Sequence, residues 1–271
     1  LRLFAYTAED QYYQPTQGEA KRLEFWLFFF PDEPSLDRLD RFNGLVQRPP
    51  HLFSARWLRT SGGLGPAPEK PERFGYTEVQ PTQAADPNAL VSRDGTRGYG
   101  LRNWGDRFSP NHWIKAGYGS SWYNNYYDQE ILYPMLSYVL TGDPAKFERA
   151  YVVATHYIDV DVCHYRAGHP EYVGGDYGLP LDHTGQLLEP GVRPETLGLV
   201  FVGLLTADPD ILETVIMMGD YTLGRVKRTE GKLGIRGGGP RCLAFPLTTL
   251  ADAYAISPNP DYLWAIRKLL D

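Results

Sequence analysis

The strongest constraint in the sequence is a unit that occurs three times in the second half of the chain. In each copy an apolar stretch ends at a short turn of small residues, and an amphipathic stretch then begins at or just after a proline. The three turns contain Asp143-Pro144, Asp208-Pro209 and Asn259-Pro260. Proline is favourable at the first helical position, and the preceding Asp or Asn side chain can accept a hydrogen bond from the new helix. The pattern therefore predicts three helical hairpins.

The predicted helices alternate between two classes. We expect apolar helices over 131–140, 196–205 and 245–255, and amphipathic helices over 145–159, 211–225 and 262–270. Such a unit buries its apolar face only by stacking against another unit. Inner apolar helices and outer amphipathic helices are typical of an α/α-toroid, and a generic helical bundle is the alternative. We predict a mainly α fold, a partial α/α-toroid. Because three hairpins are too few to close a ring, we expect a piece of a longer protein.

The first part of the chain predicts β structure followed by an irregular connector. Residues 23–30 are apolar and aromatic and end at a proline, as in a strand with a well-buried face. Apolar residues then recur every three positions over 36–45, which predicts a short helix. Proline and glycine are dense over 47–88, which predicts little regular structure and a domain boundary nearby. We therefore divide the chain into residues 1–88 and 89–271.

Composition limits the classes of partner. The net charge is −6 and no basic stretch occurs, which argues against a nucleic-acid partner. No apolar run approaches the length that spans a bilayer, so we expect no membrane partner. Aromatic residues make up 14% of the chain, and 19 of them are tyrosines. Aromatic faces stack on sugar rings while a tyrosine hydroxyl hydrogen-bonds, so the composition suits an oligo- or polysaccharide.

The two cysteines, Cys163 and Cys242, are too few for a disulfide framework and lack the spacing of a metal site. Two free, buried thiols are the expectation, and one bridge between them is the alternative. We expect no metal and no cofactor. The compartment stays open, with an extracellular or periplasmic location slightly favoured.

Candidate chemistry concentrates between residues 103 and 183. Five of the six histidines lie over 112–183, a concentration that a purely structural role does not predict. The long segments that precede each apolar helix, 99–129, 164–194 and 227–241, would gather at one end of a toroid. That end is where we expect a cleft.

Four motifs in this region carry a family resemblance when taken in order. They are Asn103-Trp104-Gly105-Asp106, Tyr123-Asn124-Asn125-Tyr126-Tyr127-Asp128, Thr141-Gly142-Asp143, and His156-Tyr157-Ile158-Asp159-Val160-Asp161-Val162-Cys163-His164-Tyr165. Together they resemble the exo-rhamnogalacturonan lyase-like family, whose members join a barrel-like domain, a β-sandwich and a C-terminal α/α-toroid. Residues 18–27 resemble the closing strands of that sandwich. The resemblance implies that residues 1–88 hold the end of a β-sandwich domain plus a Pro/Gly-rich connector, and that 89–271 form part of the toroid.

The resemblance also implies a polysaccharide lyase, which performs β-elimination on a uronate-containing pectic glycan such as rhamnogalacturonan. Elimination needs a base for the carbon-bound proton and cations or neutral donors for the adjacent carboxylate. His164 with Tyr165 is the leading catalytic pair, and His183 is the alternative base. We expect Asp161, three residues before His164, to orient its imidazole. The expected substrate-binding residues are Arg102, Trp104, Asp106, Asn124, Asn125, Asp128 and Arg236.

Two other functions stay open. A glycoside hydrolase on the same scaffold needs a pair of carboxylates, and its candidates are Asp106, Asp128, Asp161, Asp176 and Glu195. A non-catalytic carbohydrate-binding fragment is the second alternative, in which only the aromatic and polar binding residues matter.

Some of these residues also have plain structural explanations. We assign Asp143 and Asp208 wholly to helix capping. His156 lies within an amphipathic helix and is expected to be packed rather than catalytic. A metal site formed by His164, His169 and Asp161 matches no standard ligand spacing, and we do not predict one.

Overall fold

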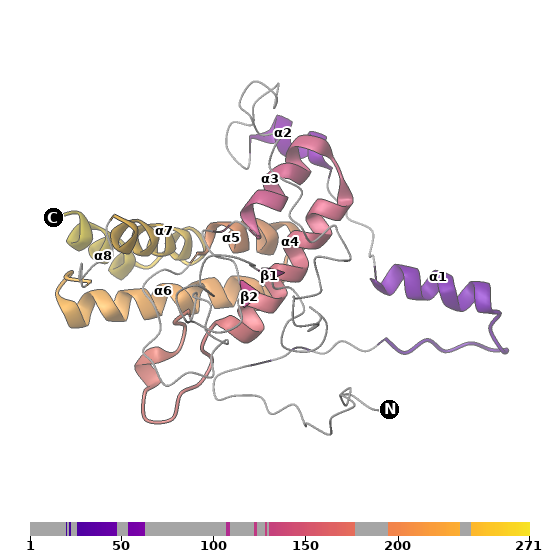
Figure 1. Ribbon diagram of the computed structural model, residues 1–271, viewed down its shortest axis with the longest axis horizontal. Coiled ribbons are helices and arrows are strands. Elements are labelled where there is room, and N and C mark those ends of the chain that lie inside the picture. The colour runs from indigo at the N-terminus through magenta and orange to yellow at the C-terminus, as the bar shows by residue number, and fades with distance from the viewer. Residues whose placement is uncertain are drawn as a thin grey trace.

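The computed structural model describes residues 20, 22, 26–47, 54–62, 107–108, 122–123, 128, 130–176, 195–233 and 240–271. The described part is mainly helical, as the sequence predicts (Figure 1). Its α-helices are α1 (Leu36–Gln47), α2 (Ala55–Ser61), α3 (Leu132–Thr141), α4 (Pro144–His156), α5 (Leu197–Thr206), α6 (Pro209–Thr229), α7 (Arg241–Ile256) and α8 (Pro260–Leu270). A π-helical turn η7 (Tyr157–Asp161) extends α4, and a 3-10 turn η8 (Pro170–Tyr172) follows. Two short antiparallel strands, β1 (Arg107–Phe108) and β2 (Trp122–Tyr123), pair with each other.

The three predicted hairpins are confirmed as α3–α4, α5–α6 and α7–α8. Each second helix begins with proline, and the preceding side chain accepts a hydrogen bond from the helix: Asp143 from Ala145 N, Asp208 from Asp210 N and Asn259 from Asp261 N. The capping predicted from the turn chemistry is therefore confirmed. The boundaries differ most at α6 and α7. α6 continues to Thr229, and α7 begins at Arg241, four residues earlier than expected.

The hairpins enclose two groups of buried apolar side chains. The first apolar cluster joins α2, α3, α4, η7, α5 and the first half of α6, and includes Ile131, Phe147 and Met218. The second apolar cluster joins the second half of α6 to α7 and α8, and includes Leu250 and Tyr262. α6 thus belongs to both clusters, and in Figure 1 it runs beside α5 and α7.

Glycines allow the closest approaches between helices. A Cβ atom at Gly198 of α5 would lie 2.5 Å from Asp128 Oδ1 and 2.8 Å from Leu132 N. A Cβ atom at Gly219 of α6 would collide with Ala253 of α7. Because real Cβ atoms do not tolerate such contacts, only glycine lets α5 meet α3 and α6 meet α7 at these distances.

The short helix α2 lies where the sequence predicts an irregular connector. Ser54 caps it by accepting a hydrogen bond from Trp57 N at 3.2 Å. Ala55 and Leu58 are buried against α3, and Arg59 donates to the carbonyl of Leu140 at 3.0 Å, near the C-terminal end of α3. Part of the connector is thus a component of the helical core. Residues 63–100 lie outside the described residues, and a boundary near 88 stays a prediction.

Residues 26–30 and α1 form an arm that projects away from the hairpins (Figure 1). Helix α1 confirms the helix predicted over 36–45. The strand predicted over 23–30 is not found in its described part, because residues 26–30 have no regular secondary structure. Phe28 and Phe30 pack on Phe42 of α1, with ring centroids 4.5 and 5.4 Å apart.

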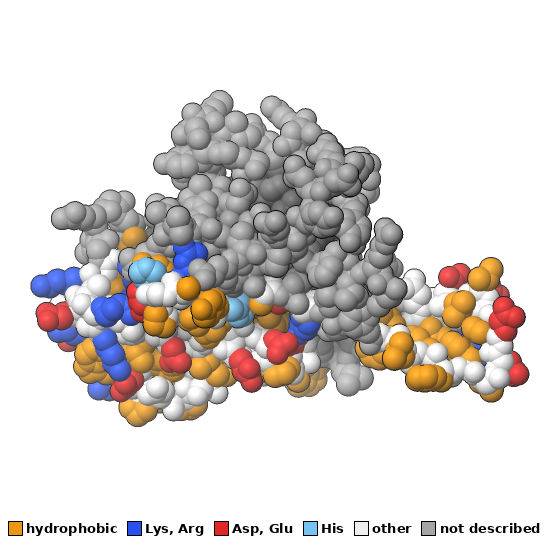
Figure 2. All heavy atoms as spheres, turned by 90° about the horizontal axis from the view of Figure 1, so that it is seen from below, with side chains coloured by type: hydrophobic (Ala, Val, Ile, Leu, Met, Phe, Trp, Pro, Cys, Tyr) orange, Lys and Arg blue, Asp and Glu red, His pale blue; other side chains and the backbone are white. Residues whose placement is uncertain are grey.

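The other face of the arm is apolar and open to solvent. Leu27 is 81% exposed and Phe29 is 90% exposed. Figure 2 shows the arm at one end of the molecule, with apolar side chains over much of its surface.

Within the described ranges, no helix is long and apolar enough to cross a membrane. Cys163 and Cys242 are free and buried, as expected.

Candidate functional site

The candidate site lies where α4 changes into the π-helical turn η7. In this turn Val162 N donates to Tyr157 O at 3.2 Å, a bond that spans five residues. π-helical turns are rare and occur frequently at functional sites. The last carbonyls of a helix need partners from outside the helix. Here Ile158 O contacts His164 Nε2 at 2.5 Å, and Asp159 O accepts from Ala20 N at 2.8 Å. Three separate groups therefore complete this helix end.

The π-helical register brings His156 and Asp161 together. His156 Nε2 lies 3.3 Å from Asp161 Oδ2, and both side chains are almost fully buried. In an α-helix the neighbouring positions on one face are three and four residues apart, whereas the π-helical repeat joins positions five apart. The expectation that His156 is packed is confirmed. Asp161, which we expected to orient His164, lies against His156 instead, and the ring of His164 contacts a backbone carbonyl.

Tyr157 lies at the centre of a buried group of carboxylates. Burial raises the pKa of Tyr157 well above its usual value, and the neighbouring Asp176, Glu195 and Asp161 raise it further. Tyr157 therefore stays protonated at any physiological pH and can act only as a neutral hydroxyl. The three carboxylates come from different segments, and each is at most 4% exposed. The structure thus gathers three of the five hydrolase candidates in one place.

Backbone pairing places Asp176 beside η7. Val162 and Asp176 form an isolated antiparallel bridge, Cys163 N donates to Gly175 O at 2.9 Å, and Gly174 N donates to Cys163 O at 2.8 Å. Gly174 has a positive φ of 84°, and a Cβ there would collide with the carbonyl group of Met217 on α6. Glycine at 174 is what lets the loop lie against α6 and return Asp176 to the site.

His164 has a defined tautomer. A carbonyl oxygen only accepts hydrogen bonds, so the contact between His164 Nε2 and Ile158 O requires that Nε2 carry the proton. In the neutral imidazole the lone pair is then on Nδ1, which is the arrangement that a general base needs. The His164 side chain is partly exposed, and the neighbouring Tyr165 is 61% exposed. Of the predicted catalytic residues, His164, Tyr165 and Asp161 are therefore described, and the first two are accessible.

Asp128 is a structural residue in the described geometry. Its Oδ2 accepts from Gly198 N at 2.6 Å, so it caps α5, whose own N-cap residue makes no side-chain cap hydrogen bond. Glu195 Oε2 in turn accepts from Asp128 N at 2.8 Å. This capping accounts for the burial of the carboxylate, and a contact of Asp128 with a sugar stays a prediction. The hydrogen bond from Asp128 N also holds Glu195, one of the carboxylates that raise the pKa of Tyr157.

One further histidine of the sequence analysis, His169, lies at the surface. His169, which we weighed as a metal ligand and did not favour, lies 3.0 Å from Glu171 through its Nδ1 and stacks on the ring of Tyr172. Among the described residues, no group of three or more His, Cys, Asp or Glu side chains is arranged to hold a metal ion. The residues that lie outside the described ranges are His183, Arg102, Trp104, Asp106, Asn124, Asn125 and Arg236.

Comparison with family models, with curated proteins and with solved structures gives no match to this chain. The functional argument therefore depends on the geometry around η7 and on the motifs in the sequence.

Proposed function

We propose that this chain is a carbohydrate-active protein of the polysaccharide lyase type, and that it performs β-elimination on a uronate-containing pectic glycan such as rhamnogalacturonan. The observation that carries the proposal is the contact of His164 Nε2 with Ile158 O on a partly exposed imidazole, because in the neutral ring this contact leaves the lone pair on Nδ1. The ordered motifs that resemble the exo-rhamnogalacturonan lyase-like family supply the substrate class.

In the proposed reaction His164 Nδ1 removes the proton from C5 of the uronate. The electron pair of the C5–H bond forms a C4–C5 double bond, and the C4–O bond breaks with its electrons on the leaving oxygen. The Tyr165 hydroxyl, beside His164 in the chain and exposed, protonates that oxygen. The substrate carboxylate needs a cationic partner while charge develops, and Arg102 and Arg236 are the proposed partners.

At the level of fold, we propose that the three hairpins are consecutive units of an α/α-toroid. The identical turn chemistry at Asp143, Asp208 and Asn259 supports this proposal, since stacked units repeat their turns. The aromatic segment over 26–30 is proposed to be a strand of a β-sandwich. Its alternating side chains, with Phe28 and Phe30 packed on Phe42 and Leu27 and Phe29 outward, support a strand with two apolar faces.

A glycoside hydrolase is the second candidate, and one observation favours it. Asp161, Asp176 and Glu195 all raise the pKa of the buried Tyr157, which supports a group of carboxylates in one region. A hydrolase needs a pair of carboxylates, one as acid and the other as base or nucleophile. Their burial is the argument against it, because the three side chains lie beneath the surface that carries His164.

One assay separates the candidates. The protein is incubated with rhamnogalacturonan, and the ultraviolet absorbance of unsaturated uronates is followed together with the appearance of reducing ends. We expect both signals to rise together. Reducing ends without the absorbance would identify the hydrolase, and binding with neither signal would identify a carbohydrate-binding fragment.

Two histidine variants then test the proposed base. His164→Gln should lower the elimination rate by about 10²–10⁴-fold, the usual contribution of general base catalysis. His169→Gln is the matched control, because His169 lies in the same loop region but is engaged with Glu171 at the surface. Equal rates for both variants would exclude His164 as the base.

A further inference from the structure

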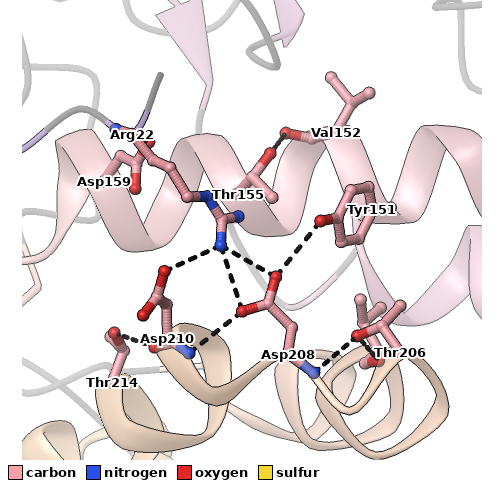
Figure 3. A network of polar contacts seen from close by, with 10 residues as sticks. Arg22, Tyr151, Val152, Thr155, Asp159, Thr206, Asp208, Asp210 and Thr214 are labelled. Atoms are coloured by element: carbon pink, nitrogen blue, oxygen red, sulfur yellow. Dashed lines mark hydrogen bonds and ion pairs between the residues drawn. The ribbon is translucent and has the colours of Figure 1, made fainter. Parts of the chain in front are cut away.

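Arg22 fastens a distant part of the chain to the helix end that holds the candidate site (Figure 3). Its guanidinium Nη1 donates to both carboxylate oxygens of Asp208, at 3.2 and 3.0 Å, and to Asp210 Oδ2 at 2.9 Å. Tyr151 of α4 donates to Asp208 Oδ2 at 3.2 Å. A single arginine thus connects to the N-terminus of α6 and, through Tyr151, to α4.

The carboxylates of Asp208 and Asp210 lie where a cation binds them favourably. Asp208 caps α6 and Asp210 lies in its first turn, where the helix dipole stabilises negative charge. The Arg22 side chain is 23% exposed and Asp208 is 9% exposed, so solvent screens their ion pair only in part. Burial alone would lower the pKa of Arg22, but Asp208, Tyr151 and Asp159 raise it, with a net rise. Arg22 is therefore permanently charged in this position.

The backbone beside Arg22 contacts η7 directly. Ala20 N donates to Asp159 O at 2.8 Å, and Arg22 N donates to Asp159 Oδ2 at 3.1 Å. Asp159 is the middle residue of η7, and its carbonyl follows the carbonyl of Ile158 that holds His164. Residues 20 and 22 therefore cap the same helix end that fixes the imidazole. Loss of this cap leaves a C-terminal carbonyl in need of a partner next to the His164 anchor.

We infer that Arg22 is a positioning residue for the candidate site: its ion pairs with Asp208 and Asp210 hold the backbone amides of Ala20 and Arg22 on η7, and so hold the π-helical end that orients His164. The role of His164 as a base rests on the proposed function, whereas the physical coupling of Arg22 to η7 does not. The last hairpin offers a comparison at the same turn position. There Lys227 Nζ forms an ion pair with Asp261 Oδ2 at 2.7 Å, far from η7 in the sequence.

The first experiment measures this coupling without any substrate. Amide hydrogen exchange is compared in the parent protein, Arg22→Met, Arg22→Lys and the control Lys227→Met. We expect Arg22→Met to accelerate exchange of the amides over 160–164 by about tenfold or more, with α7 and α8 unchanged. Arg22→Lys should restore part of the protection, because a lysine keeps the charge but not the two-oxygen contact. Lys227→Met should leave 160–164 unchanged.

A second readout follows His164 itself. Imidazole nitrogen NMR, assigned with His164→Gln, should show a protonated Nε2 in the parent and a mixture of tautomers in Arg22→Met. Where the parent catalyses elimination, Arg22→Met should lower kcat with little change in KM. An exchange increase spread evenly over all hairpins, or identical effects of Arg22→Met and Lys227→Met, would overturn the inference. Absence of elimination in the parent would overturn only the proposed function, because exchange and NMR decide the coupling independently.

Discussion

His156 Nε2 lies 3.3 Å from Asp161 Oδ2, across the transition from α4 to the π-helical turn, with both side chains buried. This pair depends on the helix changing its repeat at that point, and it links the end of α4 to the loop that carries His164. A change at His156 or Asp161 should therefore affect both the stability of the α3–α4 hairpin and the position of His164.

The first prediction concerns this buried pair. Asp161→Asn replaces the carboxylate that lies against the buried His156, and the loss of a buried polar partner costs about 1–3 kcal/mol of unfolding free energy. Urea denaturation measures the loss. His169→Gln serves as the control, since its pair with Glu171 is exposed, and it should leave the midpoint unchanged. Equal midpoints for parent and Asp161→Asn would show that the buried pair adds nothing.

The second prediction concerns the glycine that returns the chain to the site. Gly174→Ala should lower the unfolding free energy by well over about 2 kcal/mol, because the new methyl group collides with Met217 in addition to the strain of a positive φ. Gly168 has a similar φ of 77° but open space around its Cβ direction. Gly168→Ala should therefore cost only about 1–2 kcal/mol. If thermal unfolding gives the same loss for both, crowding against α6 is not the cause.

The third prediction concerns the pH dependence of stability. Burial raises the pKa of Asp252 to about 6, against the lowering effect of the hydrogen bond from Thr196, and Asp128 raises it further. Thr196 Oγ1 donates to Asp252 Oδ2 at 2.6 Å. Since the folded state holds this proton more tightly than the unfolded chain, the contribution of Asp252 to stability is greatest below its ordinary pKa of 3.8 and falls as pH rises to about 6.

Asp252→Asn removes that titration. The stability of the variant relative to the parent should therefore increase by on the order of 2–3 kcal/mol between pH 4 and pH 7. Urea denaturation at several pH values measures this difference. Asp261→Asn, an exposed carboxylate, should show no comparable trend, and a pH-independent difference for Asp252→Asn would contradict the raised pKa.

The fourth prediction concerns the apolar arm. Phe29 is 90% exposed on a segment without regular secondary structure, a combination that promotes association between chains. Phe29→Lys should reduce self-association, measured by light scattering over a concentration series, without changing the melting temperature. Leu204→Lys on α5 replaces an exposed leucine outside the arm and should have a smaller effect. If Leu204→Lys reduced self-association more than Phe29→Lys, the arm would not be the surface through which the chains associate.

Much of the helical part was predictable because its signals are local. The turn residues Asp143, Asp208 and Asn259 accept hydrogen bonds from their own helices, so the sequence neighbourhood contains the whole interaction. Helix α2 was missed because its flanking prolines and glycines dominate a stretch of 42 residues, 47–88, although Ser54 before it is a good cap.

The site was less predictable because its contacts depend on register and on distant segments. We expected Asp161 to lie beside His164, three residues later. The π-helical turn instead brings Asp161 against His156, five residues earlier. Asp176 and Glu195 reach Tyr157 from segments whose approach is set by tertiary packing. The segment at 26–30 has the alternation of a strand, but alternation does not supply the neighbouring strand that a ladder requires.

Because α6 belongs to both apolar clusters, it affects the order in which parts of the molecule unfold. Its first half anchors the hairpins that precede it, and its second half anchors only α7 and α8. Helices that pack in a smaller, separate cluster open at a lower free-energy cost than helices of a larger one. The last hairpin should therefore detach first on heating, while η7 and the imidazole it holds keep their arrangement. Calorimetry should record this as a broad or double transition, with the loss of the site in the later part.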